Sequence, residues 1–176
     1  DVGGAAGRVV YTQWLNERGG IEADLTVTRL SETEFLVVTA GATGRRDLGW
    51  LRRNLPETAD AVATDVSSSL AVLSVMGPNA RALLAKVSGA DLSNAAFPFA
   101  TSRAITIAGD TLRASRITYV GELGWELYVP ATAAGRVFDA IDAAGGAFGL
   151  KLAGMHAMDS CRMEKAYRHW GHDISD

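Results

Sequence analysis

The stretch that decides the fold is residues 9–40, VVYTQWLNERGGIEADLTVTRLSETEFLVVTA. From Ile21 to Leu30, apolar and polar residues alternate with a period of two, which is typical of a strand with one buried face. Ser31–Glu34 is a polar turn. Val9–Leu15 and Phe35–Ala40 are rich in residues that favour strands. The stretch therefore predicts an antiparallel meander of three strands.

The rest of the chain mixes helical and strand patterns. Leu48, Leu51 and Leu55 are spaced three and four residues apart, which predicts a helix that ends before Pro56. Asn79 is predicted to cap the next helix with its side chain. The further predicted elements are strands over 61–64, 70–75, 116–119 and 125–129, a hairpin turning at Gly109-Asp110, and helices over 80–87, 131–144 and 155–166.

This order of elements indicates the fold class. Strands joined by short turns alternate with a few crossover helices, rather than with one helix per strand. We therefore predict an α+β fold with mostly antiparallel sheets and packed helices, arranged as ferredoxin-like units.

Composition excludes several classes of function. The 176 residues are 48% hydrophobic and 21% charged, with a net charge of −3. This balance is that of a globular domain without a basic field, so no nucleic-acid partner is expected. No run approaches the roughly 20 apolar residues of a membrane span. The single cysteine, Cys161, rules out a disulfide framework within the chain, and we expect a cytoplasmic location.

Common cofactor motifs do not occur. Residues 3–7, GGAAG, are rich in glycine but lack the spacing of a dinucleotide fingerprint. His169 and His172 lie three residues apart beside Asp173, but Gly171 interrupts the helix that would align them. We expect no metal site.

Three segments place polar side chains within apolar patterns. Asp24 on the second strand faces solvent in the plain interpretation, or lies in a cavity where it accepts a hydrogen bond from an amine. Glu126 follows two glycines and two aromatics. It is either an exposed hairpin residue or a carboxylate that binds adjacent N–H donors of a flat heterocycle. In the third segment, Asp159 and Arg162 are one helical turn apart, and a structural ion pair is the plain interpretation.

Taken together, these segments resemble the folate-binding domain shared by the glycine-cleavage aminomethyltransferase (T-protein), dimethylglycine dehydrogenase and sarcosine dehydrogenase. The matching text is Tyr11–Leu25, Val75–Pro78, Thr118–Glu126 and Asp159–Asp173. The resemblance covers nearly the whole chain, in the order and spacing of the family. Each piece alone is a weak signal, but their collinearity is highly specific.

Within this family the flavin-dependent branch is the more similar one. Glu22-Ala23-Asp24 replaces the paired aspartates usual in T-proteins. Lys165–Ile174, KAYRHWGHDI, looks like the dehydrogenases and oxidases of N-methylglycines. The resemblance implies that residues 1–176 are the central part of the folate-binding domain. The flavin domain, with its FAD, and a C-terminal barrel would lie outside this chain.

The resemblance also implies the site residues. Asp24 matches the acid near the reactive folate nitrogens and is the candidate catalytic residue. Glu126 matches the carboxylate that binds the amino and ring N–H groups of the pterin. Thr39 and Met158 depart from T-proteins, which often carry Asn and Arg there, so contacts to folate are expected to differ. The remaining predicted cofactor-binding residues are Tyr11, Thr39, Tyr119, Arg162 and Tyr167.

The implied chemistry is one-carbon transfer. A flavin module oxidises an N-methyl amine such as dimethylglycine or sarcosine to an iminium. Tetrahydrofolate captures its carbon and yields 5,10-methylenetetrahydrofolate. The expected partners are thus folate, the small amine or its iminium, and the flavin domain of the parent chain. Two alternatives stay open: a glycine-cleavage T-protein, and a folate-binding or structural module without catalysis.

Overall fold

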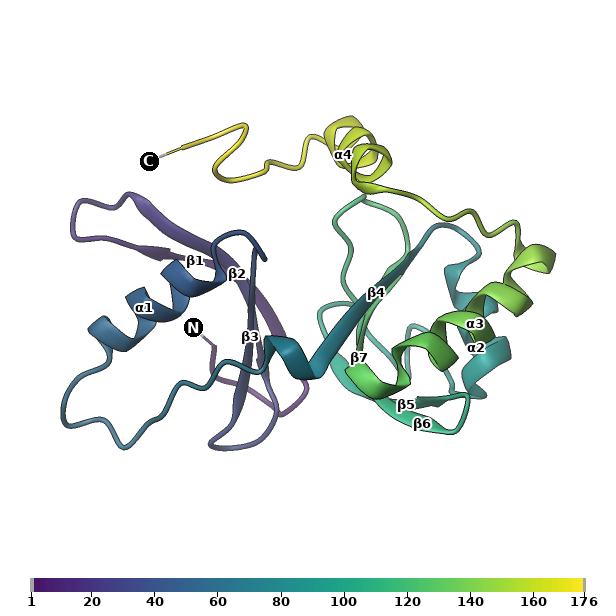
Figure 1. The fold of residues 1–176 in the computed structure, drawn as a ribbon, viewed down its shortest axis with the longest axis horizontal. Helices are drawn as coiled ribbons and strands as arrows, with labels where there is room; N and C mark the ends of the chain where they lie inside the picture. The colour runs from purple at the N-terminus through teal and green to yellow at the C-terminus, as the bar shows by residue number, and fades with distance from the viewer. Residues whose placement is uncertain (1, 176) are drawn as a thin grey trace. The chain divides into compact units, whose positions relative to one another are not determined.

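Two antiparallel sheets and four helices organise the computed structural model, which describes residues 2–175 (Figure 1). The chain divides into unit 1, Asp1–Val66 with His169–Asp176, and unit 2, Ser67–Arg168. The predicted α+β class with antiparallel sheets is therefore confirmed. The elements are β1 (Val9–Leu15), β2 (Ile21–Arg29), β3 (Phe35–Thr39), α1 (Gly44–Asn54), β4 (Leu70–Met76), α2 (Ala80–Ser88), β5 (Ser102–Ile107), β6 (Asp110–Ser115), β7 (Gly124–Pro130), α3 (Ala134–Gly145) and α4 (Met155–Glu164), with short 3₁₀ turns at Ser67–Ser69, Ala131–Ala133 and Gly146–Phe148.

Unit 1 is built on the predicted meander, in the order β1-β2-β3. The alternation along β2 is real: Ala23, Leu25 and Val27 are buried and form a small apolar cluster. Trp14 lies opposite Ala23 in the register and stacks on Trp50 of α1, with ring centroids 5.2 Å apart. This stacking places α1 on the apolar face of the sheet.

The turn between β1 and β2 is fixed by Asn16. Its Oδ1 accepts backbone N–H groups from Arg18 at 3.0 Å and from Gly20 at 2.9 Å. Gly19 has φ of +81°, a conformation that costs glycine little. An asparagine that bonds its own turn is a local device that sets the strand register.

Unit 2 carries the larger core. Its sheet has the order β4-β7-β6-β5, and α2 and α3 lie side by side against one face (Figure 1). Trp125 from β7 is fully buried there, and its ring meets Phe97 edge-on at 6.1 Å. Leu84 of α2 and Val137 of α3 complete this core without exposed surface. The opposite face of the sheet presents Glu126.

The β5–β6 hairpin corrects the predicted turn by one residue. Ile107 pairs with Asp110, so the turn residues are Ala108 and Gly109 rather than Gly109 and Asp110. Both have positive φ, at 53° and 83°. Two positive φ values match the right-handed twist of a tight hairpin, which outweighs the cost of left-handed backbone at an alanine.

Two predicted strands are wrong. Residues 61–64 form no strand: the run has strand-favouring residues, but the structure pairs it with no ladder, and the Ala63 carbonyl accepts a hydrogen bond from Arg52. Residues 116–119 form a loop, because the Ile117 N–H bonds back to the Ser115 carbonyl. The strands that pair with β7 are instead β4 and β6.

Asn79 occupies the predicted cap position of α2, but its side chain does not cap the helix. Its Nδ2 instead donates to the Phe148 carbonyl at 3.0 Å. The helix ends at Gly89, which has a left-handed conformation with φ of +64°, and the Gly89 N–H bonds to the Ala85 carbonyl. A tertiary contact has therefore replaced the local one predicted for Asn79.

Leu84→Ala is expected to destabilise unit 2 by about 2–5 kcal/mol, because it empties a fully buried site in a packed core. Hydrogen exchange of the β7 amides reports this unit alone and is expected to accelerate. Met163→Ala is the control, because Met163 belongs to the same unit and is 54% exposed, so the exchange rate of the β7 amides is expected to change little. Unchanged exchange in the Leu84 variant would show that this core does not hold β7.

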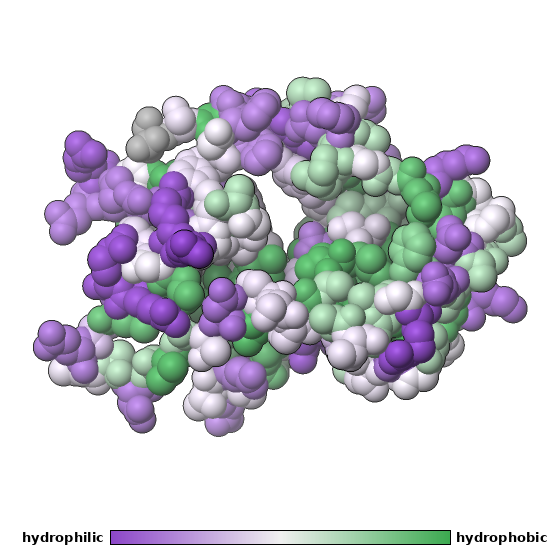
Figure 2. Space-filling model, viewed as in Figure 1, coloured by the Kyte–Doolittle hydropathy of each residue, from purple (hydrophilic) through white to green (hydrophobic). Residues whose placement is uncertain are grey.

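The surface over α1 is largely hydrophilic in Figure 2, because this helix carries four arginines. Within residues 2–175, no helix combines the length and the apolar character needed to cross a bilayer.

Candidate functional site

The predicted site residues fall in both units. Tyr11, Asp24 and Thr39 belong to unit 1, whereas Tyr119, Glu126, Arg162 and Tyr167 belong to unit 2. Each group is described within its own unit.

Asp24 lies on the polar face of the unit 1 sheet. It is half-buried, and its Oδ1 accepts a hydrogen bond from Gln13 Nε2 at 3.1 Å. The β1–β2 register pairs Gln13 with Asp24, and Tyr11 with Thr26, so these side chains share one face. Tyr11 is 65% exposed. Strand pairing thus brings together the predicted acid and an aromatic surface able to line a ligand.

Thr39 is not on that face. The β2–β3 register pairs Thr39 with Leu25, a buried residue on the side covered by α1. Because successive strand residues point to opposite sides, Thr39 and Asp24 face away from each other. The structure therefore brings Tyr11 and Asp24 together, but not Thr39.

Glu126 lies at the centre of the polar face of the unit 2 sheet. β7 runs between β4 and β6, and Glu126 pairs with Ser74 on one side and Ser115 on the other. It is half-buried, and burial raises the pKa of its carboxyl, while a hydrogen bond from Tyr128 acts in the opposite direction. A carboxylate in a partly desolvated position is stabilised by further N–H donors, which a ligand can supply.

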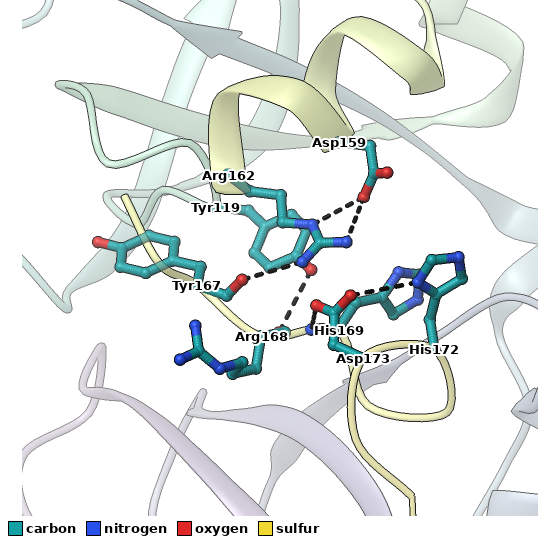
Figure 3. Close-up of polar contacts among 8 residues, drawn as sticks. All are labelled: Tyr119, Asp159, Arg162, Tyr167, Arg168, His169, His172 and Asp173. Atoms are coloured by element: carbon teal, nitrogen blue, oxygen red, sulfur yellow. Dashed lines mark hydrogen bonds and ion pairs between the residues drawn. The ribbon is translucent and has the colours of Figure 1, made fainter. Parts of the chain in front are cut away.

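Arg162 is a structural residue in this fold. It is 1% exposed, and its Nε and Nη2 contact Asp159 Oδ1 at 2.7 and 2.5 Å. Its Nη1 donates to the Tyr167 carbonyl at 3.0 Å. Figure 3 shows Arg162 reaching from α4 to both partners. The ion pair expected from the sequence is present, and it also fixes the chain after α4.

Tyr119 and Tyr167 lie together beside that arginine. Their rings are near parallel with centroids 6.4 Å apart, and the Tyr119 hydroxyl donates to the Arg168 carbonyl at 3.3 Å (Figure 3). Gly121 has φ of +68°, and a Cβ there would collide with the side chain of Lys165, which pairs with Glu122 at 3.2 Å. The loop of residues 118–123 and the end of α4 therefore hold each other in place.

The C-terminal histidines form a turn. Asp173 accepts the His169 backbone N–H at 2.8 Å and lies 3.2 Å from His172 Nδ1, and the two rings stack (Figure 3). Among residues 2–175, no three His, Cys, Asp or Glu side chains gather closely enough to hold a metal ion.

Arg162→Lys is expected to destabilise unit 2 by about 2–4 kcal/mol. Lysine cannot reproduce the fork of donors that serves Asp159 and the Tyr167 carbonyl, and its charge stays buried. Arg136→Lys is the matched control, because Arg136 also contacts one aspartate, Asp110, through Nε and Nη2, but at an exposed site. Thermal unfolding of both variants is the measurement, and equal shifts would contradict a structural role specific to Arg162.

Two residues of these clusters, Gln13 and Tyr128, were not predicted from the sequence. Gln13 is identified only by the strand register. Tyr128 could have been found, because it follows Glu126 by two residues on a strand and so must share its face.

Comparison with known proteins agrees with this geometry. The family model described as the GCVT N-terminal domain matches residues 1–176. The chain is 46% identical to 4-methylaminobutanoate oxidase (formaldehyde-forming) from Paenarthrobacter nicotinovorans, over 95% of the chain and 20% of that protein. It is 39% identical to human mitochondrial sarcosine dehydrogenase, over 99% of the chain and 20% of that protein. The chain thus spans about a fifth of the length of these curated relatives.

A solved structure matches the fold. The crystal structure of the glycine cleavage system aminomethyltransferase T from Bartonella henselae aligns with 97% of the chain and 44% of its own, with a TM-score of 0.79 and 27% identity. Fold, collinear segments and family model agree, and the chain belongs to the GCVT N-terminal domain family.

Proposed function

We propose that this domain binds tetrahydrofolate and captures the one-carbon unit released when an N-methyl amine is oxidised, forming 5,10-methylenetetrahydrofolate. The observation that carries the proposal is Glu126, a partly desolvated carboxylate that lies between Ser74 and Ser115 in one row of the sheet. Two of the relatives are named as an oxidase of 4-methylaminobutanoate and a dehydrogenase of sarcosine; both compounds are N-methyl amines, and this supports the substrate class.

Glu126 fits a pterin. The amino group and adjacent ring N–H of a pterin are two parallel donors, and a carboxylate offers two acceptor oxygens at matching separation. Burial raises the pKa of this carboxyl, and such donors would favour its ionised form. Glu126 is therefore the residue proposed to bind and orient the folate ring.

Asp24 fits the role of base. When the one-carbon unit of an iminium is transferred, two C–N bonds form to folate nitrogens and the bond to the released amine breaks. One of the two N–H protons goes to the amine nitrogen and the other needs an acceptor. Asp24 is half-buried and held by Gln13, so an ionised carboxylate there can accept that proton and stabilise positive charge on the way.

The oxidation itself is assigned to another part of the parent protein. We propose a flavin domain that carries FAD and supplies the iminium, as the similarity to sarcosine dehydrogenase suggests. Tyr11, Tyr119 and Tyr167 remain proposed folate-lining residues. Arg162 is proposed to act by fixing Tyr167.

The test uses the full-length protein. Calorimetric titration with 5-formyltetrahydrofolate measures binding, and turnover of sarcosine, dimethylglycine and 4-methylaminobutanoate is followed with and without tetrahydrofolate. We expect binding, and a switch of product from formaldehyde to 5,10-methylenetetrahydrofolate when the folate is present. No binding, together with an unchanged yield of formaldehyde, would disprove the proposal.

One observation favours a second candidate. The first relative is named as formaldehyde-forming, which describes release of the one-carbon unit rather than its capture. A domain that binds folate poorly and serves as a structural module would give the negative outcome of the same test.

A T-protein function, supported by the aminomethyltransferase fold match, would instead require turnover with an aminomethylated carrier protein and no amine oxidation.

A further inference from the structure

The polar face of the unit 2 sheet is organised in rows. Across the order β4-β7-β6-β5, the register aligns Ser74, Glu126, Ser115 and Ser102 in one row. Ser115 and Ser102 are buried and hydrogen-bonded to each other at 3.0 Å. Glu126 is therefore the one carboxylate in a row of hydroxyls.

Tyr128 occupies the next row on the same face. It is 4% exposed, and its hydroxyl donates to Glu126 Oε2 at 2.5 Å. Burial and the nearby Glu126 carboxylate both raise the pKa of the Tyr128 hydroxyl, so it stays protonated and acts as the donor. A buried donor on one oxygen fixes the rotation of the carboxylate, because a turn about its last bond would break a charge-assisted hydrogen bond.

We infer that Tyr128 is a positioning residue for ligand recognition: it holds Glu126 ionised and oriented, with Oε1 and the second lone pair of Oε2 left to accept from the ligand's two N–H groups. This inference rests on the proposed function of Glu126. Tyr128 itself need not touch the ligand. The Tyr128 hydroxyl acts through the carboxylate. Its effect on ligand affinity is therefore greatest at the pH at which that carboxylate begins to take up a proton.

The charged surroundings of Glu126 are sparse. β6 contributes Arg113, which pairs with Tyr128 in the register and points to the same face, with Nη1 3.4 Å from Ser102 Oγ. β4, LAVLSVM, contributes no charged residue, and β7 itself has none besides Glu126. Arg103 of β5 and Asp110 of β6 belong to the other face, where Arg103 lies over Phe97 and Asp110 pairs with Arg136 of α3. The helices α2 and α3 also cover that other face. On this face, the group that favours the ionised carboxyl is thus the Tyr128 hydroxyl, whose hydrogen bond lowers the pKa of Glu126.

The affinity of the site for N–H donors depends on pH through the carboxyl of Glu126. Recognition of N–H donors needs the ionised carboxylate, so affinity is lost as pH falls through the pKa of Glu126. Burial raises that pKa, and the Tyr128 hydrogen bond lowers it. Removing the hydroxyl raises the pKa further, and affinity is then lost at a higher pH.

The experiment compares Tyr128→Phe with the wild type in the full-length protein. Calorimetric titration with 5-formyltetrahydrofolate is repeated between about pH 5.5 and about pH 8.5. At the alkaline end we expect affinity to fall about 3- to 10-fold, the effect of one hydrogen bond. The midpoint of the pH-dependent loss is expected to move to higher pH, which a merely structural role would not produce.

Three further variants separate the outcomes. Ser102→Ala removes a buried hydroxyl from the same face without touching Glu126, and is expected to leave the midpoint unchanged. Glu126→Gln supplies the baseline without a titrating carboxylate. Incorporation of 3-fluorotyrosine at position 128 keeps the ring and makes the hydroxyl a stronger donor, so the midpoint is expected to move to lower pH even if the phenylalanine variant fails to fold.

The inference about Tyr128 and the proposed function fail differently. No folate binding by the wild type, or full binding by Glu126→Gln, overturns the proposed function. Binding by the wild type that depends on Glu126, but with the same affinity and midpoint after the changes at Tyr128, overturns only the role of Tyr128.

Discussion

Replacing Asp24 with asparagine is expected to lower the rate of one-carbon transfer to tetrahydrofolate at least about 100-fold, the usual contribution of a positioned base. Folate affinity is expected to change less than about threefold. Asparagine keeps the shape of the side chain, and its oxygen can still accept from Gln13, so the strand pairing is preserved. What is lost is the negative charge and the ability to take a proton.

The measurement for Asp24→Asn is the partition of product. In the full-length protein, amine oxidation should proceed at the wild-type rate, while the one-carbon unit appears as formaldehyde instead of 5,10-methylenetetrahydrofolate. Equal transfer in variant and wild type would remove Asp24 from the mechanism. A parallel fall in amine oxidation would instead indicate a disturbed fold.

Glu22→Gln provides a matched control for this substitution. Glu22 lies two residues before Asp24 on β2, and its Oε1 accepts from the Asn16 amide at 3.0 Å, as Asp24 accepts from Gln13. Each variant replaces a β2 carboxylate with the corresponding carboxamide. In both cases the carboxylate accepts a hydrogen bond from a side-chain amide, that of Gln13 or Asn16. Only the Asp24 variant is expected to lose transfer, so a comparable loss in both would point to the charge of the strand rather than to a specific base.

The fold was predictable where local signals agree with each other. Two such signals are the period of two along β2 and the turn fixed by Asn16. Both are local, because each depends on residues within or next to the strand that it specifies. The wrong strands fail for the complementary reason. Residues 61–64 have the right residue types, but a strand needs a partner, and pairing is a tertiary property that propensity does not encode.

The candidate site was predictable in its residues but not in its contacts. Resemblance supplied Asp24 and Glu126, yet no pattern in the sequence places Thr39 on the face away from Asp24, since this depends on the β2–β3 register. The burial of Arg162 was equally hidden, because a helix of low amphipathicity does not reveal which side of α4 is covered. Register and burial are set by long-range packing, which a single sequence leaves open.

Replacing Glu126 with glutamine is expected to weaken folate binding about 100-fold. Two charge-assisted hydrogen bonds of about 1.5 kcal/mol or more each would be lost or reduced, and about 3 kcal/mol corresponds to roughly that factor. Glutamine also carries an NH₂ donor that would oppose the donors of a pterin. Titration with 5-formyltetrahydrofolate measures the change, and Glu122→Gln is the control, since Glu122 is an exposed carboxylate of the neighbouring loop paired with Lys165.

The stability of the Glu126→Gln variant provides an independent check. The substitution is expected to weaken ligand binding but not to lower the free energy of unfolding. The folded protein raises the pKa of Glu126, so the contribution of this group to the free energy of unfolding is full at low pH and declines as pH rises through the folded pKa. At neutral and alkaline pH the ionised carboxylate therefore costs stability in the ligand-free protein, and glutamine removes that cost. The variant should unfold at the same temperature as the wild type or higher near pH 8, with the difference shrinking toward acid. Weaker binding in a protein that is no less stable is the signature of a carboxylate kept for its ligand, whereas loss of both would assign Glu126 to the fold.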